Sequence, residues 1–528
     1  MTTDGTARSQ PFPTLRAAAV AGVAAAGLAL AVTEVISAFA SKAGPSVVST
    51  VASRLVDLTA GALKNLAVNL FGTNDKAALL TGIVIVSLLV GAALGVAAAR
   101  HRFVGAVGFG GFGVVGILAA RADPQASAWT LGLASTLGAG AGTVTLAMLL
   151  RIATPPPVPM KSASKKPPAE DPRVKTPNRR AFLAAGGVGV VAAVATWSSR
   201  GLRGTGAAVR SRAATSLPRA RKAIAAPSTQ PFTVDGLSSY VTPNDRFYRI
   251  DTAIFVPQID ASTWKLNITG MVDTPISFTY ADLLAMDLVE EPITISCVSN
   301  EVGGDLVGNA IWRGVPLKTL LDTAGAQPGA TQIVGRSADG FTVGFPTEKA
   351  LDGRTALVAV GMNAEPLPIT HGFPARLIVA GLYGYVSATK WLSEIELTRL
   401  EDFDAYWIPR GWAKQAPIKT QSRIDVPRPR ATLPAGKVAV AGVAWAPTRG
   451  IRSVEVQIDD GPWQPARLGD VASDNTWVQW LYPWDAAPGT HRLRVRATDG
   501  TGTVQTATDH SPEPNGATGY HNRTVTIT

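Results

Sequence analysis

The sequence predicts three consecutive parts: an all-α transmembrane region, a mixed α/β domain and an all-β sandwich. Of its 528 residues, 46% are hydrophobic and only 16% are charged, whereas soluble domains carry about 25% charged residues. Long uncharged apolar stretches fall within the first 200 residues, and ten of the 12 tryptophans lie beyond residue 231. At roughly 100–200 residues per domain, the length allows about three such parts.

The membrane region is predicted from five stretches without charge, each of about 17 residues or more, which suffices to cross ~30 Å of hydrocarbon as a helix. They cover residues 17–33, 77–99, 103–120, 124–150 and 181–199. We therefore expect a four-helix transmembrane region in residues 1–150. A basic linker with a fifth transmembrane helix would follow in residues 151–230.

The distribution of charge predicts the orientation of these helices. The net charge of +11 divides into +4 for residues 1–150, +13 for 151–225 and −6 for 226–528. Basic short loops stay in the cytoplasm, so the four helices would begin and end inside. We thus expect a multi-pass protein of the cell membrane, with residues after about 200 extracytoplasmic. An acidic C-terminal part argues against a nucleic-acid partner.

The first outer loop conflicts with this pattern, because it carries Lys42, Arg54, Lys64 and Lys76. Apolar residues at helical spacing across residues 48–70 predict a helix there. It would either lie on the membrane surface as an amphipathic helix or form a packed helical cap.

The fifth helix follows Arg179 and Arg180, with Phe182-Leu183 close behind. Paired arginines before a weakly hydrophobic segment, here residues 178–199, are typical of a twin-arginine export signal. Two positive-inside anchors are the alternative. Such a signal would carry an already folded domain, and we expect the segment to remain as an anchor.

The remaining chain changes character at about residue 231. Strand-like runs at 264–269, 293–297, 332–334, 356–360 and 376–379 alternate with helix-like runs at 280–286 and 316–324. This alternation predicts a mixed α/β domain over residues 231–424. After a proline-rich stretch, short alternating strands separated by turns predict an immunoglobulin-like sandwich over residues 425–528.

Cys297 is the only cysteine, which excludes an intrachain disulfide and a cysteine-only metal cluster. It ends a strand-like run and precedes a polar, glycine-rich loop, where functional groups are common. Its thiolate is a candidate ligand for a soft metal. The alternatives are an inert core residue or a nucleophile paired with His371.

Three further clusters could bind a ligand. His371 and Arg376 are set among Gly and Pro, and an arginine there could hold a phosphate. Residues 244–249 form a polar and aromatic run, and Lys390 follows a glycine- and aromatic-rich loop. Each could equally be a loop histidine, a solvated turn or a strand cap. The usual phosphate-loop, His-Glu-x-x-His, Cys-x-x-Cys and c-type haem motifs do not occur.

Two longer runs carry a family resemblance. ISCVSNEVGGDLVGNAIWRGVPLKTLL begins at Ile295, and MNAEPLPITHGFPARLIVAGLYGYVSATKWL begins at Met362. Together they resemble the molybdenum-cofactor domain of the sulfite oxidase family over about residues 235–420. Residues 425–528 resemble the immunoglobulin-like dimerisation domain that commonly follows it.

The resemblance implies a molybdenum–molybdopterin cofactor whose metal is ligated by Cys297. It implies catalytic roles for Cys297, Tyr248 and Arg249. The cofactor-binding residues it implies are Asn244, Phe247, Tyr248, Arg249, Cys297, Asp339, His371, Arg376, Thr389 and Lys390.

The chain departs from the family's sulfite-oxidising members after the cysteine, where Glu301 and Val302 replace paired arginines. The resemblance implies oxygen-atom transfer to or from a small oxyanion or sulfur compound. A sulfoxide reductase-like enzyme and a cofactor-free membrane-tethered binding protein are the alternatives. No haem domain is attached, so a separate electron carrier, a cytochrome or a quinone-linked protein, is expected. A homodimer through residues 425–528 is also expected.

Overall fold

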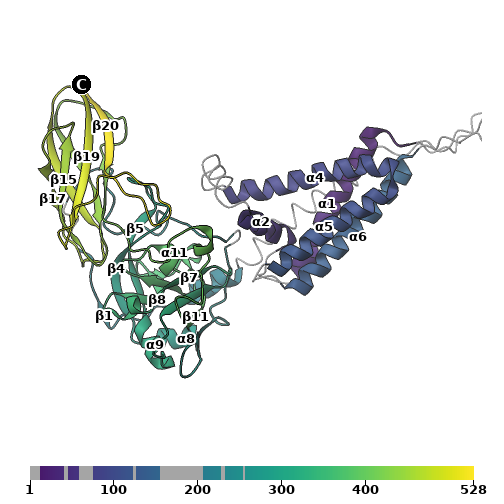
Figure 1. The fold of residues 1–528 in the computed structure, drawn as a ribbon, viewed down its shortest axis with the longest axis horizontal. Coiled ribbons are helices and arrows are strands. Elements are labelled where there is room, and N and C mark those ends of the chain that lie inside the picture. The colour runs from purple at the N-terminus through teal and green to yellow at the C-terminus, as the bar shows by residue number, and fades with distance from the viewer. Residues whose placement is uncertain are drawn as a thin grey trace, which may run out of the picture. The chain divides into compact units, whose positions relative to one another are not determined.

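The computed structural model describes residues 12–40, 46–58, 75–122, 127–154, 206–227, 232–253 and 256–528. The chain divides into two compact units, Met1–Gly206 and Ala207–Thr528 (Figure 1). The predicted fifth helix, with Arg179 and Arg180, lies outside the described residues. Each unit is described by itself.

The first unit contains the four helices predicted for residues 1–150, and each is long and apolar enough to cross a membrane. Small residues bring them together, as membrane helices require. A Cβ added at Gly95 would lie 2.2 Å from the carbonyl oxygen of Ala18, so the two backbones are in contact. These helices are α1 (Leu15–Ala40), α4 (Asp75–Arg100), α5 (Arg102–Ala122) and α6 (Ala128–Ala153).

A shorter helix, α2 (Val47–Leu58), corresponds to the helix predicted in the first outer loop. Val47 is buried and clusters with Ala120 of α5 and Leu131 of α6. Ser49 and Thr50 are also buried, at 2% and 1% exposure. Because α2 buries both apolar and hydroxyl side chains against the other helices, the structure favours the packed cap over a helix lying on the membrane surface.

The second unit begins with a mixed α/β part, as predicted, built on two sheets. The first has the order β1-β4-β5-β8-β10, with β9 paired to β8, and the second β3-β2-β11-β6-β7. The strands of the first sheet are β1 (Lys222–Ala223), β4 (Val289–Ser296), β5 (Val307–Pro316), β8 (Ala356–Met362), β9 (Glu365–Pro366) and β10 (Arg376–Val379). Those of the second are β2 (Lys265–Gly270), β3 (Ile276–Thr279), β6 (Gln332–Ser337), β7 (Thr342–Pro346) and β11 (Leu392–Thr398).

Short helices connect these strands. They are α8 (Tyr280–Ala285), α9 (Leu317–Ala324), α10 (Glu348–Leu351), α11 (Gly384–Ser387) and the 3-10 turns η2 (Ile369–His371) and η3 (Ile408–Arg410). Thr279 caps α8: its side chain accepts a hydrogen bond from the backbone N–H of Asp282. The Asp282 carboxylate accepts one from the backbone N–H of Thr279, which completes a capping box. Leu317, Leu320 and Leu321 bury one face of α9.

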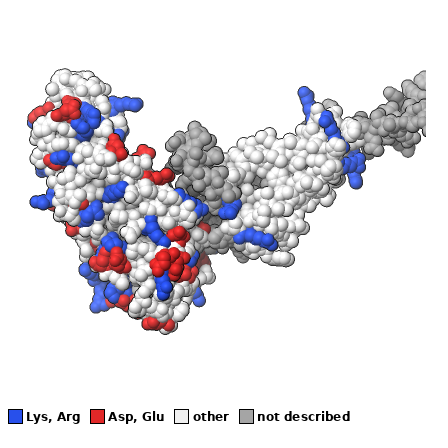
Figure 2. Space-filling model, in the orientation of Figure 1, with Lys and Arg blue, Asp and Glu red and all other residues white. Residues whose placement is uncertain are grey.

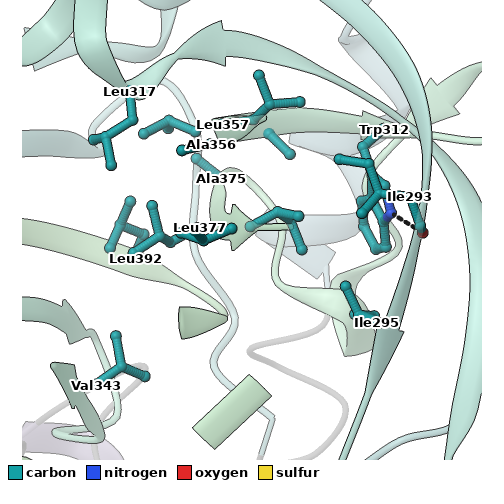
Figure 3. Close-up of a cluster of buried hydrophobic side chains, with 14 of the residues drawn as sticks. Ile293, Ile295, Trp312, Leu317, Val343, Ala356, Leu357, Ala375, Leu377 and Leu392 are labelled. Atoms are coloured by element: carbon teal, nitrogen blue, oxygen red, sulfur yellow. Dashed lines mark hydrogen bonds between the residues drawn. The ribbon is translucent and has the colours of Figure 1, made fainter. Parts of the chain in front are cut away.

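One hydrophobic core joins the two sheets (Figure 3). Trp312 of β5 is fully buried, and its indole N–H donates to the carbonyl oxygen of Ile293 on β4 at 3.2 Å. Leu377 of β10 and Leu392 of β11 contribute to the same core from the two different sheets. This packing fixes the end of β4, from which Cys297 projects.

The C-terminal part consists of two sheets with a shared core of their own. Trp480 of one sheet and Val456 of the other are fully buried in it, which confirms the all-β prediction, while the immunoglobulin-like assignment stays a prediction. The first sheet holds β12 (Gln421–Val426), β14 (Gly436–Trp445), β17 (Arg467–Leu468) and β18 (Val478–Ala486). The second holds β13 (Thr432–Leu433), β15 (Ile451–Ile458), β16 (Gln464–Pro465), β19 (Gly489–Asp499) and β20 (His521–Ile527).

The predicted domain boundary at residues 424/425 falls within β12, which pairs with β14 of this C-terminal part. Charged side chains are sparse on the helical unit and frequent, with both signs interspersed, on residues 207–528 (Figure 2). This contrast follows the predicted division between an apolar membrane region and a folded domain in water.

Candidate cofactor site

Cys297 follows the last residue of β4 and is 8% exposed. Its backbone N–H donates to the carbonyl oxygen of Leu306 at 2.9 Å, where the chain returns into β5. Asn300 closes the loop between them, because its side-chain oxygen accepts from the N–H of Leu306 at 2.8 Å. The register of the β4–β5 pair thus places the single thiol at the mouth of a tight loop.

Two tyrosines, Tyr248 and Tyr383, interact electrostatically with the thiol. Burial raises the pKa of Tyr248 far above its usual value, and Cys297 adds to the rise while Arg376 opposes it. Burial likewise raises the pKa of Tyr383 to about 12, and Cys297 contributes. Both phenols therefore stay neutral, and the group with which they interact is most useful as a thiolate.

The segment 244–249 lies against His371, as the predicted site requires. The His371 Nε2 atom is 3.0 Å from the carbonyl oxygen of Asn244. The Phe247 ring meets the His371 ring edge-on at 5.7 Å between centroids. Gly308 makes room for it, since a Cβ there would lie 2.7 Å from the Phe247 ring.

Arg376 sits at the start of β10 and is 3% exposed. Its guanidinium lies over the Trp312 ring, 4.9 Å from the centroid, and donates to the carbonyl oxygen of His371 at 3.1 Å. Burial lowers the pKa of Arg376 to about 10, against the influence of Tyr248. Burial, Arg376 and Lys390 lower the pKa of His371 to about 4, so its imidazole is neutral at physiological pH.

Lys390 and Arg249 share one buried carboxylate. Asp251, whose side chain is 4% exposed, accepts from the Lys390 ammonium at 3.1 Å and from Arg249 Nε at 2.9 Å. Burial lowers the pKa of Lys390 to about 8, although Asp251 acts in the opposite direction. Burial raises the pKa of Asp339. The charge of Asp251 adds to this rise, and that of Lys390 opposes it. Asp339 therefore belongs to the same electrostatic cluster.

The residues present fit an anionic pterin cofactor. Three buried polar atoms of the predicted site residues have no hydrogen-bond partner within the described part of the chain: His371 Nδ1, Arg376 Nε and Thr389 Oγ1. Buried polar atoms are almost always paired, so a polar ligand is expected here. Arg249, Arg376 and Lys390 outnumber the two carboxyl groups of Asp251 and Asp339 in this cluster, and such a surplus of positive charge suits a phosphate.

The structure thus brings Asn244, Phe247, His371 and Arg376 into contact. Charge interactions link Cys297, Tyr248, Arg249, Lys390 and Asp339 to this group, and Thr389 precedes Lys390 in the chain. Sequence reasoning missed Asp251 and Tyr383. Asp251 carries no motif beyond its place two residues after Arg249, and Tyr383 was visible only as part of a glycine- and aromatic-rich loop. Within the described ranges, no three His, Cys, Asp or Glu side chains gather as a metal site. The fold and site therefore define a domain that holds an anionic cofactor beside a single thiol.

Comparison with known proteins names that cofactor. The model of a family described as the oxidoreductase molybdopterin binding domain matches residues 253–407. Human mitochondrial sulfite oxidase is 28% identical over 273 residues, which cover 44% of this chain and 50% of that protein. The uncharacterized oxidoreductase YuiH of Bacillus subtilis is 32% identical over 153 residues, covering 29% of this chain and 74% of that protein. The NAD(P)H nitrate reductase of Hordeum vulgare is 31% identical over 166 residues, covering 26% and 18%.

The chain belongs to this family of molybdopterin-binding oxidoreductases, and sulfite oxidase is one of its relatives. Its cofactor is the molybdenum–molybdopterin group. The chain spans about half the length of the sulfite oxidases it matches.

Proposed function

We propose that the protein is a membrane-anchored molybdenum-cofactor oxidoreductase of sulfite oxidase type, whose second unit works outside the cytoplasm. It would transfer an oxygen atom to or from a small oxyanion or sulfur compound. The observation that carries the proposal is that Tyr248 interacts electrostatically with both Cys297 and Arg376, while buried atoms of His371, Arg376 and Thr389 are left without a protein hydrogen-bond partner. An enzyme whose cofactor performs the redox chemistry needs mainly a ligand, a pocket and tuned electrostatics from the protein.

The residues divide the work by their chemistry. The bound cofactor supplies the two-electron redox change. Cys297 would give its thiolate to the metal, and Arg376, Lys390 and Thr389 would hold the pterin and its phosphate by charge and hydrogen bonds. Neutral His371 would accept or donate a hydrogen bond without adding charge, consistent with its pKa of about 4.

Tyr248, Arg249, Asn244 and Phe247 would line the substrate side, with Tyr248 as a neutral donor next to the thiolate. Asp339 would act less directly, through its charge coupling to Lys390.

The substrate is proposed from the loop after Cys297. Glu301 is exposed there, and a carboxylate near the pocket entrance would repel a doubly charged anion such as sulfite. This favours a less charged oxyanion or a neutral sulfur compound. A sulfoxide reductase-like activity is therefore the second candidate, supported by the same Glu301 and Val302. A binding protein without cofactor is the candidate from another class.

Electrons would leave to, or arrive from, a separate carrier, either a cytochrome or a quinone-linked protein. The four membrane-compatible helices support a location next to membrane carriers. Residues 425–528 are proposed to mediate a homodimer, since they form a second folded core attached to the cofactor-binding part.

The test of the function uses the full chain purified in detergent. We expect about one molybdenum and one pterin per chain by elemental and fluorescence analysis. Turnover should then be measured on sulfite, nitrate and methyl sulfoxides, with an artificial electron acceptor and an artificial donor in turn. Turnover on one compound class assigns the reaction and its direction. Metal-free protein from molybdate-fed cells would instead support the binding-protein candidate.

Export of the folded second unit is tested by replacing Arg179 and Arg180 together by lysine. The positive charge is kept, so an orientation set by charge alone should survive. We expect the folded domain to stay in the cytoplasm, so protease added to intact spheroplasts should not reach residues 231–528. Normal external digestion of this double variant would mean that the arginines are anchors only.

A further inference from the structure

The loop that follows Cys297, residues 298–306, is held from two sides. On its own side, Gly304 N–H donates to the carbonyl oxygen of Glu301 at 2.9 Å, and Asn300 N–H donates to the carbonyl oxygen of Cys297 at 3.1 Å. On the other side, the carbonyl oxygen of Gly304 accepts a hydrogen bond from Arg423 of the C-terminal sandwich.

Arg423 of β12 connects the sandwich to this loop. Its Nη1 donates to the carbonyl oxygen of Gly304 at 2.8 Å. Its Nη2 donates to Ser238 Oγ at 2.9 Å, and its Nε donates to Asp425 at 2.7 Å. The side chains of Arg423 and Asp425 are only 10% and 8% exposed. Three separate bonds to a planar, buried guanidinium fix its orientation, which a lysine could not reproduce.

His521 of β20 supports the same loop sterically. Gly303 has a φ of +78° and packs so closely that a Cβ there would lie 2.1 Å from the His521 ring. His521 Nδ1 accepts from the backbone N–H of Ile424 at 2.9 Å. The ring therefore stands in a fixed position between the sandwich and the loop, and only a glycine can pass beneath it.

We propose that Arg423 is a positioning residue that holds the loop after Cys297 closed, so that the C-terminal sandwich sets the access to the metal-ligating thiol. The proposal rests on the proposed role of Cys297 as the metal ligand. It gives the sandwich a part in the active site that is separate from dimerisation. Glu301, at the tip of the same loop, would be placed by the same contacts.

The test uses the full chain in detergent, purified from cells starved of molybdate and from cells supplied with it. Cys297 is the only cysteine, so a maleimide dye reports this thiol alone. In the starved protein, Arg423→Ala should raise the labelling rate about tenfold or more, the effect of losing a charge-assisted hydrogen bond. The melting midpoint should stay near that of the wild type. Arg423→Lys, which restores the charge, should label at an intermediate rate.

Arg496→Ala is the matched control. Arg496 lies on β19 of the same sandwich and is paired to Glu455 of the neighbouring strand β15 at 2.8 Å. Its labelling rate should equal that of the wild type. Equal rates for Arg423→Ala and wild type, or an equal rise in Arg496→Ala, would overturn the proposal. If Arg423→Ala does not fold, Ser238→Ala removes one of the three bonds, and an unchanged rate in that variant overturns the proposal as well.

The two sources of protein separate this inference from the proposed function. Metal ligation should protect Cys297 in wild-type protein from molybdate-fed cells. Equal labelling of fed and starved wild-type protein would contradict the role of Cys297 as the ligand. The comparison of Arg423→Ala with wild type in starved protein would still decide the role of Arg423.

Discussion

The two units of this chain pack by opposite means. In the helical unit, α1 and α4 meet through Gly22, Gly91 and Gly95, with backbones in contact. In the second unit, whole indole rings such as Trp312 and Trp480 are buried. Lipid tails are as apolar as side chains, so membrane helices associate through close backbone packing. In water, removing large apolar surfaces from solvent drives the folding. We therefore expect a larger side chain at a helix contact to destabilise the first unit, and a smaller side chain in the core to destabilise the second.

The largest effect is expected from Trp480→Ala in the core of the sandwich. Trp480 is fully buried, and truncating such a residue costs about 3–5 kcal/mol. Denaturant unfolding followed by tryptophan fluorescence should show this loss. Trp463→Ala, at a partly exposed ring beside Tyr520, should cost clearly less. Equal losses for the two variants would contradict the assignment of Trp480 to the core.

A smaller effect is expected in the helical unit, where adding bulk should be harmful. Gly95→Leu would place a Cβ 2.2 Å from the carbonyl oxygen of Ala18 and should cost about 1–3 kcal/mol by overpacking. Gly82→Leu, on the same helix, is the control, because nothing lies within 4 Å of an added Cβ there. Thermal unfolding in detergent, followed by helical circular dichroism, measures both. The comparison fails if Gly82→Leu is the more damaging change.

The effect of pH belongs to the second unit and builds up gradually, from nothing at pH 6.5. Burial, with Arg523 and Arg423 nearby, lowers the pKa of His521 to about 3, and that of His371 is lowered to about 4. Between pH 6.5 and these values the unfolded chain binds more protons than the folded one. The stability these histidines provide is therefore complete above about pH 6.5 and is lost as the pH falls. Each contributes a slope of up to about 1.4 kcal/mol per pH unit.

His521→Gln should reduce the dependence of the unfolding free energy on pH by up to about 1.4 kcal/mol per pH unit. The measurement is the unfolding free energy of the second unit between pH 6.5 and 4. His510→Gln, at an exposed histidine, is the control and should leave the slope unchanged. An unaltered slope in His521→Gln would show that the ring is protonated in the folded protein as readily as in the unfolded one.

The two units also differ in how far sequence could predict them. Four long apolar helices follow from the length and composition of apolar runs, which depend on local residues alone. The strands of the α/β part, such as β10 at Arg376–Val379, follow from local patterns too. The sequence could not show whether α2 packs against the other helices. A helix lying on a membrane surface and a helix packed as a cap have the same spacing of apolar residues.

For the site, the motifs identified Cys297, His371 and Arg376, and the structure brings them together. Asp251, Tyr383 and Arg423 could not be found in this way. Their importance arises from contacts with residues 139, 86 and 119 positions away: Lys390, Cys297 and Gly304. Such contacts depend on the register of strands and on how the sandwich packs, which no local pattern records.

The account depends above all on Cys297 as the ligand of molybdenum. X-ray absorption at the molybdenum edge of the full chain, compared between wild type and Cys297→Ser, tests this directly. We predict that the variant loses one molybdenum–sulfur contribution and all turnover, while its melting midpoint stays within a few degrees of the wild type, since serine is close to isosteric. Unchanged sulfur scattering together with unchanged turnover in Cys297→Ser would contradict the account.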